Sequence, residues 1–253
     1  MAVSTLQAAL VFSVLAAWEL AVRRGWLPEA LVSSPGRIAT LIGQWVATGF
    51  LWPHLAATFQ AMATGLLLGL LLGAALGFVV IFVPAVGDVV EPTMATLNAV
   101  PRLVFYPLLA LWLGLGIPSK AALVVTIVLF VGFFNTLGAI REIDRQLVAQ
   151  VRVLGARPRA MLRHLYVPAT LLWIMTSLRT SVGLAFIGAI LGEYMGPMRG
   201  IGNVIMGAQN LFRPDGVMAG LIVTLALAGV IDAGLQRMEA RWSAWRQGEL
   251  HER

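Results

Sequence analysis

Long apolar runs dominate the pattern of the chain, and shorter polar stretches that carry most of the prolines and arginines separate them. A helix needs roughly 20 apolar residues to cross about 30 Å of hydrocarbon, and only elements that satisfy their own backbone hydrogen bonds can do so. The pattern predicts six membrane-spanning helices, at about residues 6–22, 56–83, 92–115, 119–140, 172–195 and 216–236.

Composition supports a membrane protein with one domain. Of 253 residues, 59% are hydrophobic and only 12% are charged, and the mean hydropathy is +0.85. Soluble domains carry about 25% charged residues, so this chain has too few charged side chains to form the surface of a soluble protein. We expect an all-α, polytopic helix bundle, a single membrane domain over residues 1–253 with its first apolar run retained.

The net charge of +6 reflects topology rather than nucleic-acid binding, because the arginines cluster at the ends of the predicted spans. The loop after the fourth span holds six arginines and the C-terminal tail four, against five arginines and Lys120 on the other side. The positive-inside rule therefore places this loop and both termini in the cytoplasm. Arg23 and Arg24, directly after the first span, favour the opposite orientation.

Two further patterns concern packing and the membrane surface. Residues 25–53 contain three prolines and a short amphipathic segment, which predicts a helix lying at the interface. In the second span every fourth residue is small, with Gly65, Gly69, Gly73 and Gly77 in its later part. Such a stripe lets another helix approach closely, within or between subunits, which is more common than a permeation surface.

The stretch from Asp144 to Ala169 is too polar to span the membrane, and its pattern is too regular for an irregular loop. Asp144 is placed to cap a first short helix, which Gly155 closes in the left-handed conformation. Pro158 suits the first turn of a second helix, and Pro168 is expected to end it. The pair forms a compact knob with an apolar face, which by composition alone is typical of a basic amphipathic element on anionic lipid.

Several motifs give this knob another interpretation. They are SSP at 33–35, LWPHLAAT at 51–58, VPRLVFYPLLALWLGLG at 100–116, FFNTLGAIREID at 133–144, SLRTSVGLAFIGAILGEYMG at 177–196, GIGNVI at 200–205 and AQNLFRPDGVMAGLIV at 208–223. In order and spacing, the chain resembles permeases of ATP-binding-cassette (ABC) importers of the nitrate, sulfonate, taurine and bicarbonate type. The knob resembles the EAA loop of those permeases.

The resemblance implies a type I importer (MetI-like) fold that works as a homodimer in the bacterial inner membrane. It implies a cytoplasmic ATPase dimer, which binds ATP and Mg, and an extracytoplasmic substrate-binding protein as partners. This chain would bind no cofactor and no nucleic acid.

By the same resemblance, the knob at about residues 141–171 would couple the permease to the ATPase. The candidate coupling residues are Asp144, Leu147, Ala149, Val151, Leu154, Gly155, Ala156, Met161, Leu165 and Pro168. Leu147, Val151 and Leu154 are expected to share one face. The chain departs from the family at Ala149–Val151, where the usual carboxylate of the EAA signature is missing, which puts individual coupling residues in doubt.

Ionisable residues inside spans are functional candidates. Arg102, Asn135, Arg179 and Glu193 are candidates for the pathway or a gate, although an ion pair or a helix-to-helix hydrogen bond is the more common role of such residues. Glu193 could instead contact the binding protein. Glu19, near the end of the first span, is expected to reach the interface.

No nucleotide-binding G-x-x-x-x-G-K-[ST] motif, metal-ligand set or catalytic triad occurs, so the chain is not expected to be an enzyme. A secondary transporter should show ionisable residues at the middle of several spans, and none are present. We expect an importer permease for a small solute, an anion or alternatively a pyrimidine-type vitamin precursor.

Overall fold

The computed structural model describes residues 2–196 and 198–251, and the side chains at 6, 9–196 and 198–238. The described part is built of helices and contains no strand. It divides into two units, one of residues 1–57 and 197–253, the other of Thr58–Gly196.

The first unit contains α1 (Ala2–Arg23), α2 (Glu29–Val32), α3 (Pro35–Ala47), the start of α4 (Leu51–Phe82), α11 (Ile201–Asn210) and α12 (Pro214–His251). Helix α1 covers the predicted first span, and α3 is the expected short amphipathic helix. Ser34 caps α3, and Glu19 of α1 accepts the Gly36 N–H at 2.9 Å. The Glu19 carboxylate therefore satisfies a backbone donor at the start of α3, where a negative charge is favourable.

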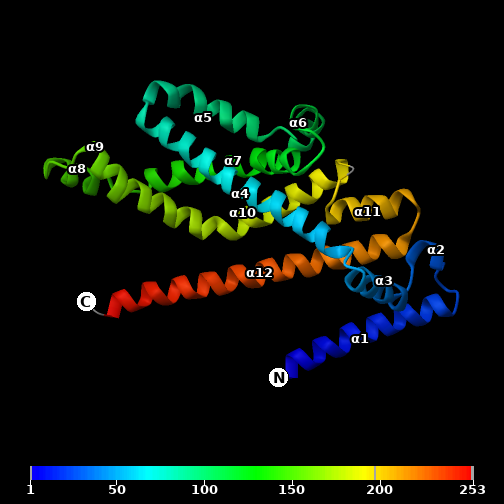
Figure 1. Ribbon diagram of the computed structural model, residues 1–253. Coiled ribbons are helices and arrows are strands. Elements are labelled where there is room, and N and C mark those ends of the chain that lie inside the picture. The colour runs from blue at the N-terminus through cyan, green and yellow to red at the C-terminus, as the bar shows by residue number, and fades with distance from the viewer. Residues whose placement is uncertain (1, 197, 252–253) are drawn as a thin grey trace. The chain divides into compact units, whose positions relative to one another are not determined.

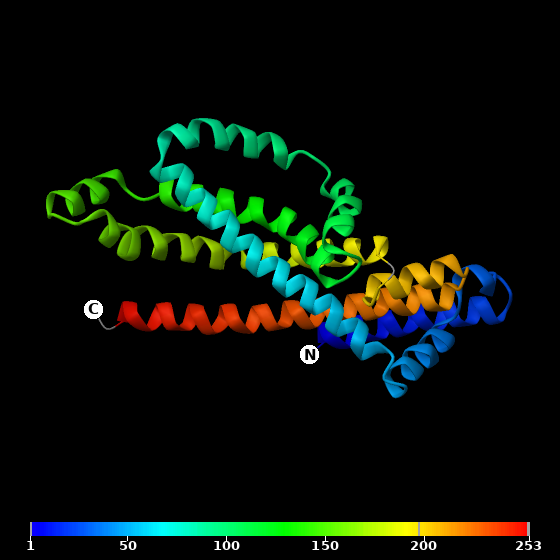
Figure 2. The same ribbon diagram turned by 45° about the horizontal axis from the view of Figure 1, so that its top comes forward.

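The second unit contains most of α4, then α5 (Pro84–Asn98), η1 (Arg102–Phe105), α6 (Tyr106–Leu113), α7 (Ile117–Arg141), α8 (Arg145–Val153), α9 (Pro158–Met161), the π-helical η2 (Leu162–Tyr166) and α10 (Val167–Met195). Helices α7 and α10 pack against each other as an antiparallel hairpin, and α8 and α9 project at its closed end (Figures 1 and 2).

The glycine stripe of α4 packs within the chain, against α7. A Cβ on Gly73 would lie 2.2 Å from the Leu129 carbonyl oxygen, and one on Gly65 would lie 2.4 Å from Val124 Cβ. Gly69 and Gly77 likewise face Val128 and Thr136. At Gly73 the nearest atoms of α7 are backbone atoms, so the two helix backbones meet there without a side chain between them, which only a stripe of small residues permits.

The expectation of one continuous third span at 92–115 was wrong. Helix α5 begins earlier and ends at Asn98, and the following segment turns away from it by 95°. Pro101 lies in the break, where it removes a backbone donor and disfavours a helical conformation of the residue before it. Arg102 then folds back to donate a hydrogen bond to the Asn98 carbonyl oxygen at 2.7 Å.

Four of the described helices are long and apolar enough to cross a membrane, and the bent pair of α5 with η1–α6 makes a fifth if it is one span. They are Leu51–Phe82, Ile117–Arg141, Pro158–Met195 and Pro214–Met238. The count of six therefore stays a prediction, with α1 as the remaining candidate.

Candidate functional site: the knob and the α7–α10 hairpin

Local sequence signals define both ends of α8 in the knob. The Asp144 carboxylate accepts the Gln146 N–H at 2.7 Å and caps the first turn. At the other end Gly155 has φ +84°, its N–H bonds to the Arg152 carbonyl, and the Ala156 N–H bonds to the Val151 carbonyl. These two bonds form a Schellman motif, which turns the chain into α9 and confirms the predicted cap and turn.

A small apolar core attaches the knob to the rest of the unit. Ile140, Met161 and Tyr166 are buried, and Val148, Val151, Ala156 and Leu165 pack around them. The ring of Phe82, at the end of α4, meets the Tyr166 ring edge-on at 5.3 Å between centroids. Each buried apolar side chain of this size contributes about 1.5–3 kcal/mol, so the knob is held as a defined body.

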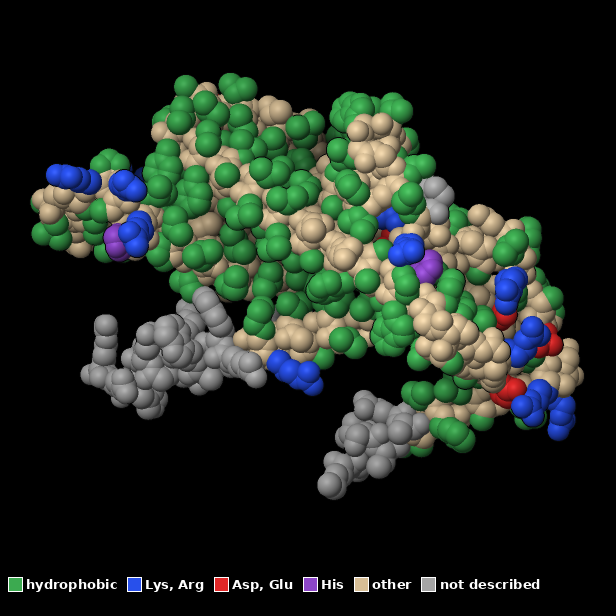
Figure 3. Space-filling model, in the orientation of Figure 1, with side chains coloured by type: hydrophobic (Ala, Val, Ile, Leu, Met, Phe, Trp, Pro, Cys, Tyr) green, Lys and Arg blue, Asp and Glu red, His purple; other side chains and the backbone are tan. Residues whose placement is uncertain are grey.

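The outward surface of the knob is apolar at its tip and basic around it. Val153 is 86% exposed and Leu154 85% exposed, and Leu147 and Ala149 are also exposed. Basic side chains gather on the knob, at the left of Figure 3. The expected common face of Leu147, Val151 and Leu154 is thus divided, because Val151 packs inward while the two leucines face outward.

Pro168 does not end the second helix of the knob, contrary to expectation. The chain runs as one helical segment from Pro158 to Met195. The π-helical turn Leu162–Tyr166 precedes Pro168, which then occupies the first turn of α10. A π turn changes the local hydrogen-bond pattern, and a residue in the first turn of a helix does not need an N–H donor, so proline is tolerated here.

Adjacent residues at the entrance to the knob bond to two different helices. The Arg141 guanidinium, at the end of α7, pairs with Glu91 of α5 at 2.7 Å. The next residue, Glu142, accepts the indole N–H of Trp173 on α10 at 2.9 Å. The sequence places Arg141 and Glu142 within a family motif but assigns them no role. Their partners, Glu91 and Trp173, are distant in the sequence and become neighbours only in the fold.

The candidate pathway residues do not form one cluster. Asn135 donates to the Ser177 hydroxyl at 2.6 Å and so joins α7 to α10. Arg102 lies over the Phe130 ring, 4.8 Å from its centroid, and Arg179 is exposed on α10. Glu193 is fully buried near the end of α10 that is remote from the knob.

Lys120 is the residue that sequence reasoning missed. The charge pattern counts it only among the basic residues on the side opposite the knob, yet it is 1% exposed and lies in the first turn of α7. Its position three residues into an apolar run, as the only lysine of the chain, was the available signal.

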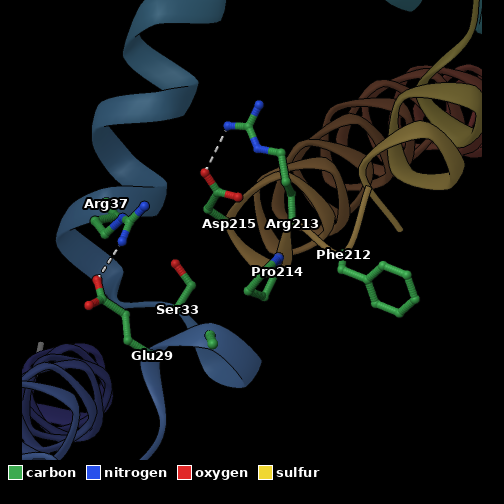
Figure 4. A pocket seen from close by; sticks show the side chains of 8 residues that line it. Glu29, Ser33, Arg37, Phe212, Arg213, Pro214 and Asp215 are labelled. Carbon is green, nitrogen blue, oxygen red and sulfur yellow. Dashed lines mark hydrogen bonds and ion pairs between the residues drawn. The ribbon is translucent and has the colours of Figure 1, made fainter. Parts of the chain in front are cut away.

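The first unit holds a charged cavity of about 390 Å³. Arg37 pairs with Glu29 at 2.7 Å on one side, and Arg213 pairs with Asp215 at 3.0 Å on the other (Figure 4). The hydrogen bond to the Glu29 carboxylate raises the pKa of the Arg37 guanidinium. Beside the cavity, Phe212 has φ +51° and is 92% exposed, so its ring projects from the turn between α11 and α12.

Comparison with known proteins places this arrangement in a family. A family model described as "Binding-protein-dependent transport system inner membrane component" matches residues 65–244. The aliphatic sulfonates transport permease protein SsuC of Escherichia coli (strain K12) is 32% identical over 232 residues, 92% of this chain and 88% of that protein. The riboflavin transport system permease protein RibX of Chloroflexus aurantiacus is 33% identical over 244 residues, 95% of this chain and 89% of that protein.

A solved structure supports the fold. The MetNI methionine ABC transporter in an inward facing conformation superposes with a TM-score of 0.62 at 17% identity, over 77% of this chain and 95% of that chain. The match over residues 65–244 and the two permease relatives show that the chain belongs to the binding-protein-dependent transport system inner membrane components, and it is an ABC importer permease.

Proposed function

We propose that the whole chain acts as one permease domain that passes a small solute into the cytoplasm, as half of a homodimer. A partner ATPase dimer binds ATP and Mg and supplies the energy, and this chain binds no cofactor. The observation that carries the proposal is the knob, whose exposed apolar tip at Val153 and Leu154 lies at the end of two long packed helices.

Coupling follows from where the knob is attached. Val153 and Leu154 are suited to an apolar cleft on the ATPase, because their burial there removes apolar surface from water. Movement of the ATPase would then move the knob, and Arg141 and Glu142 would pass that movement to α5 and α10. Ala149 stands where the family usually has a carboxylate, so the cleft on this ATPase would not rely on that charge.

The orientation proposed is that the knob and both termini face the cytoplasm of a bacterium, in its inner membrane. The basic residues of the knob support it, since cytoplasmic loops are enriched in arginine. Arg241 and Arg246 of the tail lie outside the described side chains, and Arg253 lies outside the described residues.

On this orientation the charged cavity of the first unit and Phe212 face the outside. We propose them as the surface for the substrate-binding protein. An exposed aromatic ring held in a strained backbone conformation beside charged groups of both signs is typical of a recognition surface.

The solute is proposed to be a small anion of the sulfonate, taurine, nitrate or bicarbonate kind, with a pyrimidine-type vitamin precursor as the alternative. Relatives of similar identity are named for sulfonates and for riboflavin. The binding protein would set the choice.

The test is purification of the solubilised chain with its native partners, in wild type, Leu154→Asp and Leu154→Met forms. We expect wild type and Leu154→Met to carry a stoichiometric ATPase and Leu154→Asp to lose it, because a carboxylate cannot enter an apolar cleft without a large desolvation cost. Absence of an ATPase from the wild type, or its retention by Leu154→Asp, would overturn the proposal.

A further inference from the structure

The α7–α10 hairpin is fastened along its length, beginning at the knob. Trp173 bonds to Glu142 and packs against Gly138, where a Cβ would lie 3.3 Å from the ring. Farther along, Asn135 bonds to Ser177. Helices packed this closely move as a unit, since protein interiors have low compressibility.

At the end remote from the knob, the Lys120 side chain lies along a groove of α10. A Cβ on Gly192 would lie 3.4 Å from Lys120 Cα, Cβ and Cγ, and one on Gly196 would lie 3.5 Å from Lys120 Cε. The stem therefore runs toward the C-terminal end of α10, which is at Met195. A cation is favourable there, because the last carbonyl groups of a helix lack intrahelical partners and carry partial negative charge.

Glu193 is the second buried charge at this end. Its exposed fraction is 0%, and it directly follows Gly192, the residue that meets the Lys120 side chain, so the two opposite charges are buried in the same contact between α7 and α10. Tyr106 of α6, 2% exposed, also lies close, since a Cβ on Gly196 would be 2.4 Å from its hydroxyl. A buried charge without compensation is costly, whereas a compensated pair can set one arrangement of its helices.

We propose that Lys120 and Glu193 form a charge clasp, a pair of positioning residues that fastens α7 to α10 at the end remote from the knob. The clasp lies about 33 Å along α7 from Glu142, at 1.5 Å per residue. With both ends fastened, a displacement at the knob reaches the far end of the pathway as movement of one body. The inference rests on the proposed importer function and adds to it the residues that transmit the movement.

The first test compares Lys120→Met, Glu193→Gln and the double variant in proteoliposomes with the ATPase and the loaded binding protein. Each single variant leaves one buried charge uncompensated, so we expect transport, and the ratio of stimulated to basal ATPase activity, to fall about tenfold or more. The double variant buries no charge and should recover most of both. A double variant no better than the worse single variant would overturn the clasp.

The second test uses the wild-type chain. Lys120 is its only lysine, so acylation by a membrane-permeant amine reagent, read by mass spectrometry, reports on this residue apart from the N-terminus. A permanent clasp keeps Lys120 unreactive in both the resting and the ATP-vanadate-trapped transporter. Arg24→Lys, an exposed position, is the control that must react. Labelling of Lys120 in the trapped state at the rate of the control would overturn the proposal, since the site would then open as a gate.

The two tests separate this inference from the proposed function. If the substitutions at Lys120 and Glu193 impair only the clasp, these variants should still copurify with the ATPase. Wild-type protein that never associates with an ATPase would instead contradict the importer function. If Lys120 were still protected from acylation in such a protein, the clasp would serve stability alone, and the inference that it transmits movement would be overturned.

Discussion

The indole N–H of Trp173 donates to Oε2 of Glu142 at 2.9 Å, which ties α10 to the point where the chain leaves α7 for the knob. The same ring packs on Gly138. One side chain of α10 thus contacts α7 through both a polar and an apolar interaction. Both contacts lie next to the knob, which is proposed to contact the ATPase.

Replacing Trp173 by Phe should weaken coupling without preventing assembly. Phe keeps an aromatic ring against Gly138 but cannot donate to Glu142, so one hydrogen bond, worth about 1 kcal/mol, is lost. We expect a several-fold fall in ATPase stimulation by the loaded binding protein, measured on the reconstituted complex. Glu142→Gln keeps an acceptor oxygen and serves as the control. Equal stimulation of the ATPase in Trp173→Phe and wild type would show that this hydrogen bond does not contribute to coupling.

Replacing Gly155 by Pro should abolish transport while membrane insertion persists. Proline fixes φ near −65°, whereas Gly155 has φ +84° and donates its N–H to Arg152. Beyond its chain neighbours, nothing lies within 4 Å of a Cβ built at this position, so the expected effect comes from the backbone conformation and the lost N–H donor.

The control for that change is Gly155→Asn, since asparagine enters the left-handed region at low cost. It should retain at least half of the uptake of radiolabelled substrate into proteoliposomes. Wild-type uptake by the proline variant would contradict the role given to this turn.

Replacing Gly73 by Ala should destabilise the second unit. The added methyl group would lie 2.2 Å from the Leu129 carbonyl oxygen, so α4 must move away from α7. Overpacking of this kind costs about 1–3 kcal/mol. Gly183→Ala is the matched control, because it lies on α10 with nothing within 4 Å and gains helix propensity. Thermal unfolding in detergent checks both, and an unchanged midpoint in Gly73→Ala would argue against close α4–α7 packing.

Replacing Asp144 by Ala should loosen the first turn of α8, because the Gln146 N–H loses its partner. The expected cost is about 1 kcal/mol. Hydrogen exchange of α8 amides should accelerate in Asp144→Ala and stay near wild type in Asp144→Asn, which caps equally well. Equal protection in all three forms would mean that tertiary contacts alone hold this turn.

The two ends of α8 in the knob could be predicted from the sequence, whereas the course of the chain at Pro168 and the features that depend on distant residues could not. Asp144 and Gly155 act on atoms within five residues, so their patterns were sufficient. The break at Pro101 was missed because apolar composition masks a change of direction. Lys120 was missed because its burial depends on Gly192 and Gly196, more than 70 residues away in the sequence.

The π turn at Leu162–Tyr166 has a consequence for rotational phase. Each residue of an α-helix advances the chain by about 100°, and a π turn accommodates one residue more than an α turn. The π turn therefore absorbs one residue with little change of phase: deleting one residue from it would leave the knob nearly in register with the face of α10 that packs on α7, whereas deleting one residue from the α-helical part of α10 would rotate the knob by about 100°. The direction in which the tip at Val153 and Leu154 points is therefore set by the number of α-helical residues between the knob and the packed face of α10, and the additional residue of the π turn leaves that direction nearly unchanged.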